Sequence, residues 1–204
     1  MMTSERKTRT GLEPGSRPRR RIDVLGVLAL LVWTAAPTAQ EAAPAPFGRS
    51  PTLKVKAWAG KDPVVTLEYP AKDWRVSGRG LASLVSVEHK TGEAAVALEY
   101  EVRERPTPPR LVNDTFVAIE QDLIHALNPQ VKDITARILT VGERRVVMLD
   151  FTRAGDSGAE RVRVYVMPIE RQVFRLVCRA VPGRFADSEP VFSHIAASFT
   201  GPAS

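Results

Sequence analysis

Cysteine is nearly absent from this chain, with Cys178 the sole example among 204 residues. A single thiol cannot form an internal disulfide, so the stability of the fold must come from its hydrophobic core. Cys178 follows Phe174 and Leu176 at two-residue spacing, which predicts a small apolar residue on one face of a strand. The alternative, a reactive thiol, would need a neighbour that lowers the thiol pKa, and this strand face offers none.

Histidine is also scarce. His89, His125 and His194 fall on one predicted strand and two separate predicted helices, without the HxH or HExxH spacing that gathers metal ligands. His125 follows Asp122 by three residues, so the two side chains can meet, although a solvated helix flank is the favoured interpretation. No GxSxG motif is present either. We therefore predict no catalytic residue, no metal site and no cofactor.

The chain also lacks an apolar run near the roughly 20 residues that a membrane-spanning helix needs. The run Val24–Trp33 is shorter, follows a basic segment and precedes the small residues of Thr34–Gln40. This layout is typical of a secretory signal peptide, which we assign to residues 1–39, with cleavage after Ala36 or Ala39. The protein is then exported, to the periplasm or the cell exterior. The alternative is an uncleaved N-terminal anchor. No cysteine follows the run, which excludes a lipid anchor on cysteine.

The positive charge of the chain is concentrated in this leader. Residues 1–39 hold seven basic and three acidic residues, which supply +4 of the formal +6 and leave about +2. The high isoelectric point is therefore no indication of nucleic-acid binding. Residues 40–51 are rich in alanine and proline and are predicted to be a flexible linker. Residues 52–200 suit one compact domain.

The first part of that domain alternates apolar and polar residues, which predicts strands. The predicted strands are Leu53–Ala57, Val65–Tyr69, Leu84–His89 and Glu93–Arg103. In the last of these, the residues expected to point inward are Val96, Leu98, Tyr100 and Val102. Beyond Pro70, Trp74 lies in a segment that Gly78 and Gly80 interrupt.

A helix is predicted next, capped by Asn113 or Asp114 and stopped at Asn128–Pro129. Its apolar stripe is expected to contain Phe116, Ile119, Leu123, Ile124 and Leu127. A further strand, Val131–Val141, then leads to Gly142.

Three closely spaced strands follow Gly142, and their side chains can be assigned to faces by alternation. The predicted faces are Val147, Leu149 and Phe151; Val162, Val164 and Val166; and Phe174, Leu176, Cys178 and Ala180. For the second and third sets to meet one core, the hairpin between them needs a loop of three or five residues, which we predict around Glu170.

The chain ends in a predicted helix with Asp187 or Ser188 as its N-cap and Pro190 in its first turn. Phe192, Ile195, Ala196 and Phe199 are expected to share its buried side. The predicted order of strands, helix, four strands and helix indicates an α+β fold, with a mostly antiparallel sheet whose two faces the helices cover.

Two stretches of the sequence resemble the PsbP-like family, which includes an extrinsic lumenal protein of photosystem II, bacterial exported relatives and a nuclear-import factor. They are VTLEYPAKDWRV and YVMPIERQVFRLVCRAVPGRFADSEPVFSHIAASF. The shared features lie at Tyr69, Pro70 and Trp74, at Phe174–Ala180, and at Phe185, Pro190, Phe192, Ile195, Ser198 and Phe199. The resemblance extends from about Lys61 to Phe199.

This resemblance implies an α/β/α sandwich and a domain that binds or stabilises a larger assembly without catalysis. The N-terminal extension by which photosynthetic members dock has no counterpart here, so photosystem binding is not transferred.

The most specific surface that the alternation predicts is a basic face on the last two long strands. Arg161, Arg163, Arg175 and Arg179 would gather there around Tyr165. The favoured interpretation places these arginines under a helix, with their stems covering apolar area. The alternative is a docking face for an acidic partner or an anionic surface.

Three functions remain open from the sequence. The first is an exported, non-catalytic binding or accessory domain of the cell envelope with an unknown partner. The second is a small envelope hydrolase or ligand-binding enzyme that uses a cleft between helix and sheet. The third is a structural protein held by an uncleaved N-terminal segment.

Overall fold

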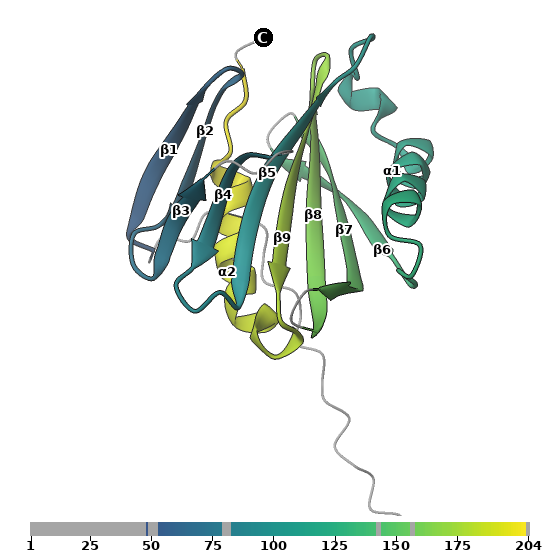
Figure 1. Ribbon diagram of the computed structural model, residues 1–204. Coiled ribbons are helices and arrows are strands. Elements are labelled where there is room, and N and C mark those ends of the chain that lie inside the picture. The colour runs from purple at the N-terminus through teal and green to yellow at the C-terminus, as the bar shows by residue number, and fades with distance from the viewer. Residues whose placement is uncertain (1–47, 49–52, 79–82, 142–143, 156–157, 203–204) are drawn as a thin grey trace, which may run out of the picture. The chain divides into compact units, whose positions relative to one another are not determined.

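The computed structural model describes residues 48, 53–78, 83–141, 144–155 and 158–202 (Figure 1). In these ranges the predicted order of strands, helix, strands and helix is confirmed. The strands are β1 (Val55–Lys61), β2 (Val64–Pro70), β3 (Trp74–Gly78), β4 (Ser83–His89), β5 (Ala94–Val102), β6 (Thr135–Val141), β7 (Arg144–Gly155), β8 (Gly158–Ile169) and β9 (Gln172–Ala180). The helices are α1 (Asp114–Leu127) and α2 (Pro182–Ser198), with a 3-10 turn at Pro109–Leu111.

Seven of these strands form one antiparallel sheet in the order β3-β4-β5-β9-β8-β7-β6. The strand β9 therefore lies between β5 and β8, although it comes last in the sequence. A separate two-stranded sheet consists of β1 and β2. The expected α+β fold with a mostly antiparallel sheet is thus confirmed, and the two-stranded sheet is an addition that the pattern did not predict.

Each face of the large sheet has its own hydrophobic core. On one face, Phe174, Leu176 and Cys178 pack with Phe192 and Ile195 of α2. On the other face, the valines of β8 pack with Phe116 of α1 and with the Val147, Leu149 and Phe151 side chains of β7. The helices therefore cover opposite faces of the sheet, as in an α/β/α sandwich, and in Figure 1 α1 lies beside β6 and β7.

The β1–β2 hairpin packs against α2, through the buried residues Val65 and Leu67. The end of the chain closes this contact. Thr66 and Thr200 exchange two backbone hydrogen bonds of 2.9 Å, and the Glu68 N–H donates to Ser198 Oγ at 2.9 Å. An early strand and the last residues of the domain are therefore held side by side.

The expected three- or five-residue loop around Glu170 is wrong, because Ile169 pairs directly with Gln172 and only Glu170 and Arg171 form the turn. A two-residue turn keeps the strict alternation, so the valines of β8 and the Phe174 set lie on opposite faces of the sheet. Sequence reasoning assumed one core, whereas the sheet has a core on each side.

The expected buried stripe of α1 is also partly wrong. Phe116 is buried as expected and Asn113 caps the helix by accepting from the Phe116 N–H. However, Ile119 is 53% exposed and Leu127 is 72% exposed, whereas Glu120 is only 2% exposed. The helix is rotated so that a carboxylate faces the sheet, because arginines of the sheet lie beneath it.

Three further boundaries differ from expectation. The helix α2 begins at Pro182 with Val181 as its N-cap, one and a half turns before Asp187 and Ser188, because proline at the first helical position fits the helix start. The segment that begins at Trp74 is a strand, β3, which includes Gly78, whereas Gly80 lies outside the described residues. Val102, expected to point inward, is 62% exposed, because β5 extends beyond the core at this end.

The proposed signal peptide, residues 1–39, and nearly all of the proposed linker, residues 40–51, lie outside the described residues. Among the residues that are described, no helix is both long enough and apolar enough to cross a membrane.

The two-residue turn can be tested at Glu170, whose φ of 52° is unfavourable for a residue with a Cβ. We expect Glu170→Gly to raise the free energy of unfolding by about 0.5–1 kcal/mol in urea titrations. Arg171 does not have a positive φ, so Arg171→Gly should lower stability. Equal effects of the two substitutions would contradict the turn geometry.

Candidate binding cleft

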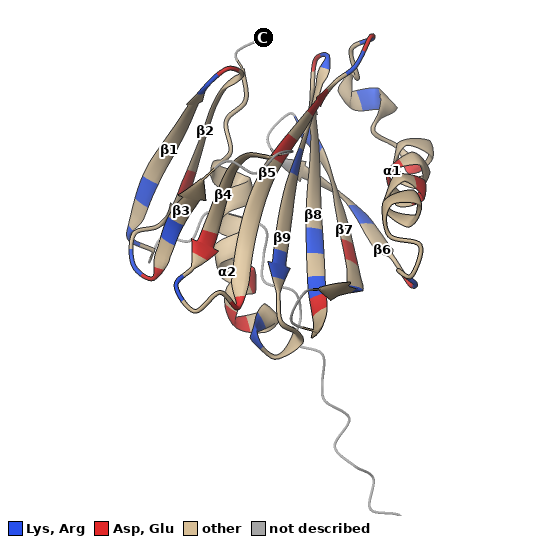
Figure 2. Ribbon diagram, in the orientation of Figure 1, with Lys and Arg blue, Asp and Glu red and all other residues tan. Residues whose placement is uncertain are grey.

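The structure separates the five residues of the expected basic face. Arg161, Arg163 and Tyr165 pair with Ala180, Cys178 and Leu176, and so share the α2 side of the sheet. Arg175 and Arg179 pair with Val166 and Val162 on the α1 side. The common basic face does not form, because the two-residue turn sends the two pairs of arginines to opposite faces. Acidic and basic segments adjoin on neighbouring strands instead (Figure 2).

Arg163 is buried beneath α2, and all three of its guanidinium nitrogens donate to carboxylates. Its Nε and Nη2 donate to Asp150 at 2.8 and 3.0 Å, and its Nη1 donates to Glu189 of α2. Burial alone would lower the pKa of Arg163, but the hydrogen bonds and charges of Asp150 and Glu189 raise it overall. Arg163 therefore joins α2 to β7 and is not a docking residue.

Arg175 has the corresponding role beneath α1. Its Nε and Nη2 donate to Glu120 at 2.9 and 3.0 Å, and its Nη1 donates to Glu101 at 2.9 Å. Arg103 Nη2 also donates to Glu120, at 2.9 Å. Burial is the largest influence on the Arg175 pKa and lowers it, but the two carboxylates raise it overall. The preferred interpretation of the sequence, arginines covered by a helix, is right for Arg163 and Arg175.

The other two arginines are more open. The Arg161 guanidinium lies 4.4 Å from the centre of the Phe185 ring on α2, a cation–π contact. Arg179 has 41% of its side chain exposed and donates a single hydrogen bond, from Nη1 to Glu160 at 2.8 Å.

Tyr165 and Cys178 belong to the core beneath α2. Burial raises the pKa of Tyr165 to about 12, and its hydroxyl lies 3.4 Å from Ser193 Oγ. Burial also raises the pKa of the fully buried Cys178 thiol, which keeps it protonated. The expectation that Cys178 packs as a small apolar residue is confirmed.

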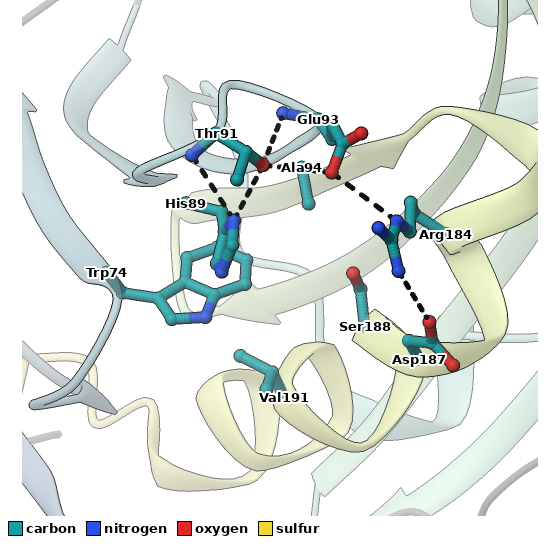
Figure 3. A pocket seen from close by; sticks show the side chains of 9 residues that line it. All are labelled: Trp74, His89, Thr91, Glu93, Ala94, Arg184, Asp187, Ser188 and Val191. Carbon is teal, nitrogen blue, oxygen red and sulfur yellow. Dashed lines mark hydrogen bonds and ion pairs between the residues drawn. The ribbon is translucent and has the colours of Figure 1, made fainter.

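A cleft of about 230 Å³ lies between the first turns of α2 and the end of the sheet where β4 turns into β5 (Figure 3). Its apolar wall consists of Trp74, Ala94 and Val191. Trp74 is fixed in place by edge contacts of its ring with His89 and with Phe192, at centroid distances of 5.6 and 6.3 Å. The wall is therefore continuous with the core and rigid.

The rim of the cleft is a connected series of polar groups (Figure 3). Thr91 Oγ lies 2.8 Å from His89 Nδ1 and donates to Glu93 at 3.0 Å. Arg184 of α2 then bridges Glu93 and Asp187, at 3.4 and 3.5 Å. Because Arg184 is 58% exposed, these two ion pairs are weak and can open.

Ser188 supplies the remaining polar group of the cleft, and no hydrogen bond joins its hydroxyl to His89 or Thr91 (Figure 3). The contacts among His89, Thr91 and Glu93 join residues two apart around one turn, so they stabilise that turn. What the arrangement offers a ligand is an apolar wall with hydrogen-bonding groups at its edge.

The three histidines are dispersed, as the sequence indicated. His89 is in the cleft, His125 is exposed on α1, and His194 is buried with its Nε2 at 3.3 Å from Glu68. Within the described part of the chain, no group of three or more His, Cys, Asp or Glu side chains could hold a metal ion.

Comparison with solved structures identifies the architecture. The solution structure of CyanoP, the cyanobacterial PsbP of Synechocystis sp. PCC 6803, aligns over 77% of this chain and 99% of its own length, with a TM-score of 0.56 and 14% identity. The chain has a PsbP-like fold. The fold that the sequence motifs implied is thereby confirmed.

Two further structural neighbours come from other bacteria. LpqN of Mycobacterium tuberculosis, described as involved in cell envelope biogenesis, aligns over 72% of this chain and 92% of its own, with a TM-score of 0.50 and 11% identity. A Bacteroides thetaiotaomicron VPI-5482 protein aligns over 73% of this chain and 49% of its own, with a TM-score of 0.51 and 10% identity. No protein-family profile and no curated protein matches the sequence.

The ion cluster beneath α1 gives a stability prediction. Glu120→Gln leaves Arg103 and Arg175 without their shared buried charge, so we expect a loss of about 3 kcal/mol in the free energy of unfolding. The matched control is Glu104→Gln on the exposed surface, which should change little. Urea titration measures both, and similar losses would show that Glu120 does not fix α1 to the sheet.

Tyr165 gives a pH prediction. Burial raises the folded-state pKa of Tyr165 to about 12, against about 10 in the unfolded chain. The contribution of this shift to the free energy of unfolding is therefore complete below pH ~10 and is lost as the pH rises toward ~12. The loss is on the order of 2–3 kcal/mol. We expect Tyr165→Phe to lack this part of the alkaline destabilisation in denaturant titrations across that window. If the free energy of unfolding falls equally with pH in the natural chain and in Tyr165→Phe, Tyr165 is not the source of this loss.

Proposed function

We propose that this chain is an exported, non-catalytic binding domain of the cell envelope, and that the cleft between α2 and the β4–β5 turn receives one side chain of its partner. The observation that carries the proposal is the cleft itself. Its apolar wall of Trp74, Ala94 and Val191 is fixed by the core, whereas its rim is polar and partly exposed.

The dimensions and composition of the cleft favour a protein side chain as its occupant. A volume of about 230 Å³ is smaller than the roughly 300–1,000 Å³ of drug-sized ligand pockets. A small apolar pocket with a polar rim is the usual receptor for an anchor residue in a protein interface. Ser188 can form a hydrogen bond with the partner's backbone next to the anchor residue. Arg184 and Glu93 can do the same when their ion pair opens.

The proposed compartment, the cell envelope, is supported by the sequence of residues 1–39 and by a protein of similar structure. The basic segment, apolar run and small residues of 1–39 favour export. The envelope role stated for LpqN supports the same compartment. The partner is then a protein of the envelope.

A hydrolase in the same cleft has less support. It would require a hydroxyl held by a base, and Ser188 is not hydrogen-bonded to His89 in the cleft (Figure 3). Thr91 contacts His89, but within a turn that needs the contact for its own structure. The third candidate function, a structural protein held by an uncleaved N-terminal segment, rests on residues outside the described ranges.

The cleft proposal is tested first by photo-crosslinking in the native envelope. A photoreactive residue at position 188, inside the cleft, should yield a crosslinked partner that mass spectrometry identifies. The control is position 186, which is exposed on the same helix but does not line the cleft. The same crosslinks from both positions would place the contact on the helix surface in general.

Affinity measurements with the identified partner complete the test. We expect Ser188→Trp, which fills the cleft, to weaken binding about tenfold or more, the effect of losing a central anchor. Ala186→Trp adds the same side chain outside the cleft and should leave the affinity unchanged. If Ser188→Trp binds as the natural chain does, the cleft is not the binding site.

A further inference from the structure

The ion clusters of the described residues differ in their balance of charge. Beneath α2, one arginine, Arg163, meets two carboxylates. Beneath α1, Arg103 and Arg175 meet Glu120 and Glu101. A third cluster, at the tip of the β7–β8 hairpin, is different, because Arg153 and Arg179 share the single carboxylate of Glu160. Among the described residues, Glu160 is therefore the one carboxylate within hydrogen-bonding distance of both guanidinium groups of this third cluster.

The hydrogen bonds of the third cluster leave donors available. Arg153 directs Nε and Nη2 toward Glu160 at 3.4 Å, and Arg179 directs only Nη1 toward it, at 2.8 Å. In Arg163 and Arg175, by contrast, Nε, Nη1 and Nη2 all donate to carboxylates. Since a guanidinium carries five N–H donors, Arg153 and Arg179 keep several for another acceptor.

A hollow of about 190 Å³ lies at this cluster, lined by Asn128, Arg153, Gly155, Glu160 and Arg179, with Ala154. The hollow requires glycine at position 155, because a Cβ there would collide with the side chain of Glu160. The absent side chain lets the carboxylate lie against the hairpin, where it can orient both guanidinium groups. The arginines are then held in place before any ligand arrives.

We propose that this hollow binds a single oxyanion, a phosphate or a carboxylate group, between Arg153 and Arg179. Arginine suits this ligand because its planar donors match two oxygens of a phosphate or carboxylate at once. Glu160 acts as a positioning residue because it accepts hydrogen bonds from both guanidinium groups, and its negative charge limits the affinity for an anion. Glu99 also interacts with Arg153 through its charge, and burial, the largest influence on the Glu99 pKa, raises that pKa.

The test uses the full chain with sodium phosphate and sodium acetate as probes, titrated calorimetrically at neutral pH and constant ionic strength. We expect saturable phosphate binding that chloride does not reproduce. Arg153→Gln and Arg179→Gln should each weaken it about tenfold or more, as expected for a lost charged hydrogen bond. Arg137→Gln is the control, because it removes the same charge from an exposed position on β6. Stronger binding of phosphate than of acetate assigns the site to phosphoryl groups, and the reverse order assigns it to carboxylates.

Glu160→Gln separates a binding site from a merely structural cluster. Removing the competing carboxylate should strengthen phosphate binding several-fold, even though it removes ion pairs from the fold. Binding that is absent, equal in all arginine variants, matched by chloride, or weakened by Glu160→Gln would overturn the proposal. Ser188→Trp should not affect phosphate binding, so this site and the cleft are tested independently.

Discussion

The pairing of β8 with β9 through a two-residue turn is the constraint on which most of this structure depends. It fixes the alternation so that each face of the sheet receives one half of the side chains of both strands. Val164 and Arg175 consequently face α1, whereas Tyr165 and Phe174 face α2. A sheet that is apolar on both faces needs a cover on both faces, and the two helices provide it.

The same constraint explains why arginines are buried in this domain. Alternation places Arg163 and Arg175 at positions that a helix covers, so each must be neutralised there. Asp150 and Glu189 neutralise the first, and Glu101 and Glu120 the second. The ion pairs thus define where each helix can lie, and they explain why α1 turns a carboxylate, and not an isoleucine, toward the sheet.

Local signals in the sequence were sufficient for most of the fold. Alternation locates the strands from β4 to β9, Asn113 is one of the two cap candidates that the sequence offers, and the aromatic residues of α2 are assigned correctly to the core. The errors arose where long-range contacts decide. The orientation of α1 depends on arginines from β9 and from the segment after β5, and no helical period in Ile119 or Leu127 can reveal them.

The candidate sites were less accessible to sequence reasoning. Trp74 and His89 were noted for other reasons, but their meeting with Arg184 and Ser188 requires the β3–β4 pairing and the packing of α2. Likewise, Arg179 was assigned to a basic face, whereas its actual neighbour, Arg153, comes from a strand on the other side of β8. Only the three-dimensional structure shows that these two arginines share one carboxylate, that of Glu160.

The hydrogen bonds between Thr66 and Thr200 have a consequence for the way the protein is made. Thr200, which pairs with the early strand β2, is synthesised after all the described strands, and the aromatic residues of α2 that fill the core precede it only slightly. This contact therefore cannot form until Thr200 has been synthesised. Because the two partners are far apart in the sequence, their pairing is a non-local step of folding, which is expected to be slower than the pairing of strands within a hairpin.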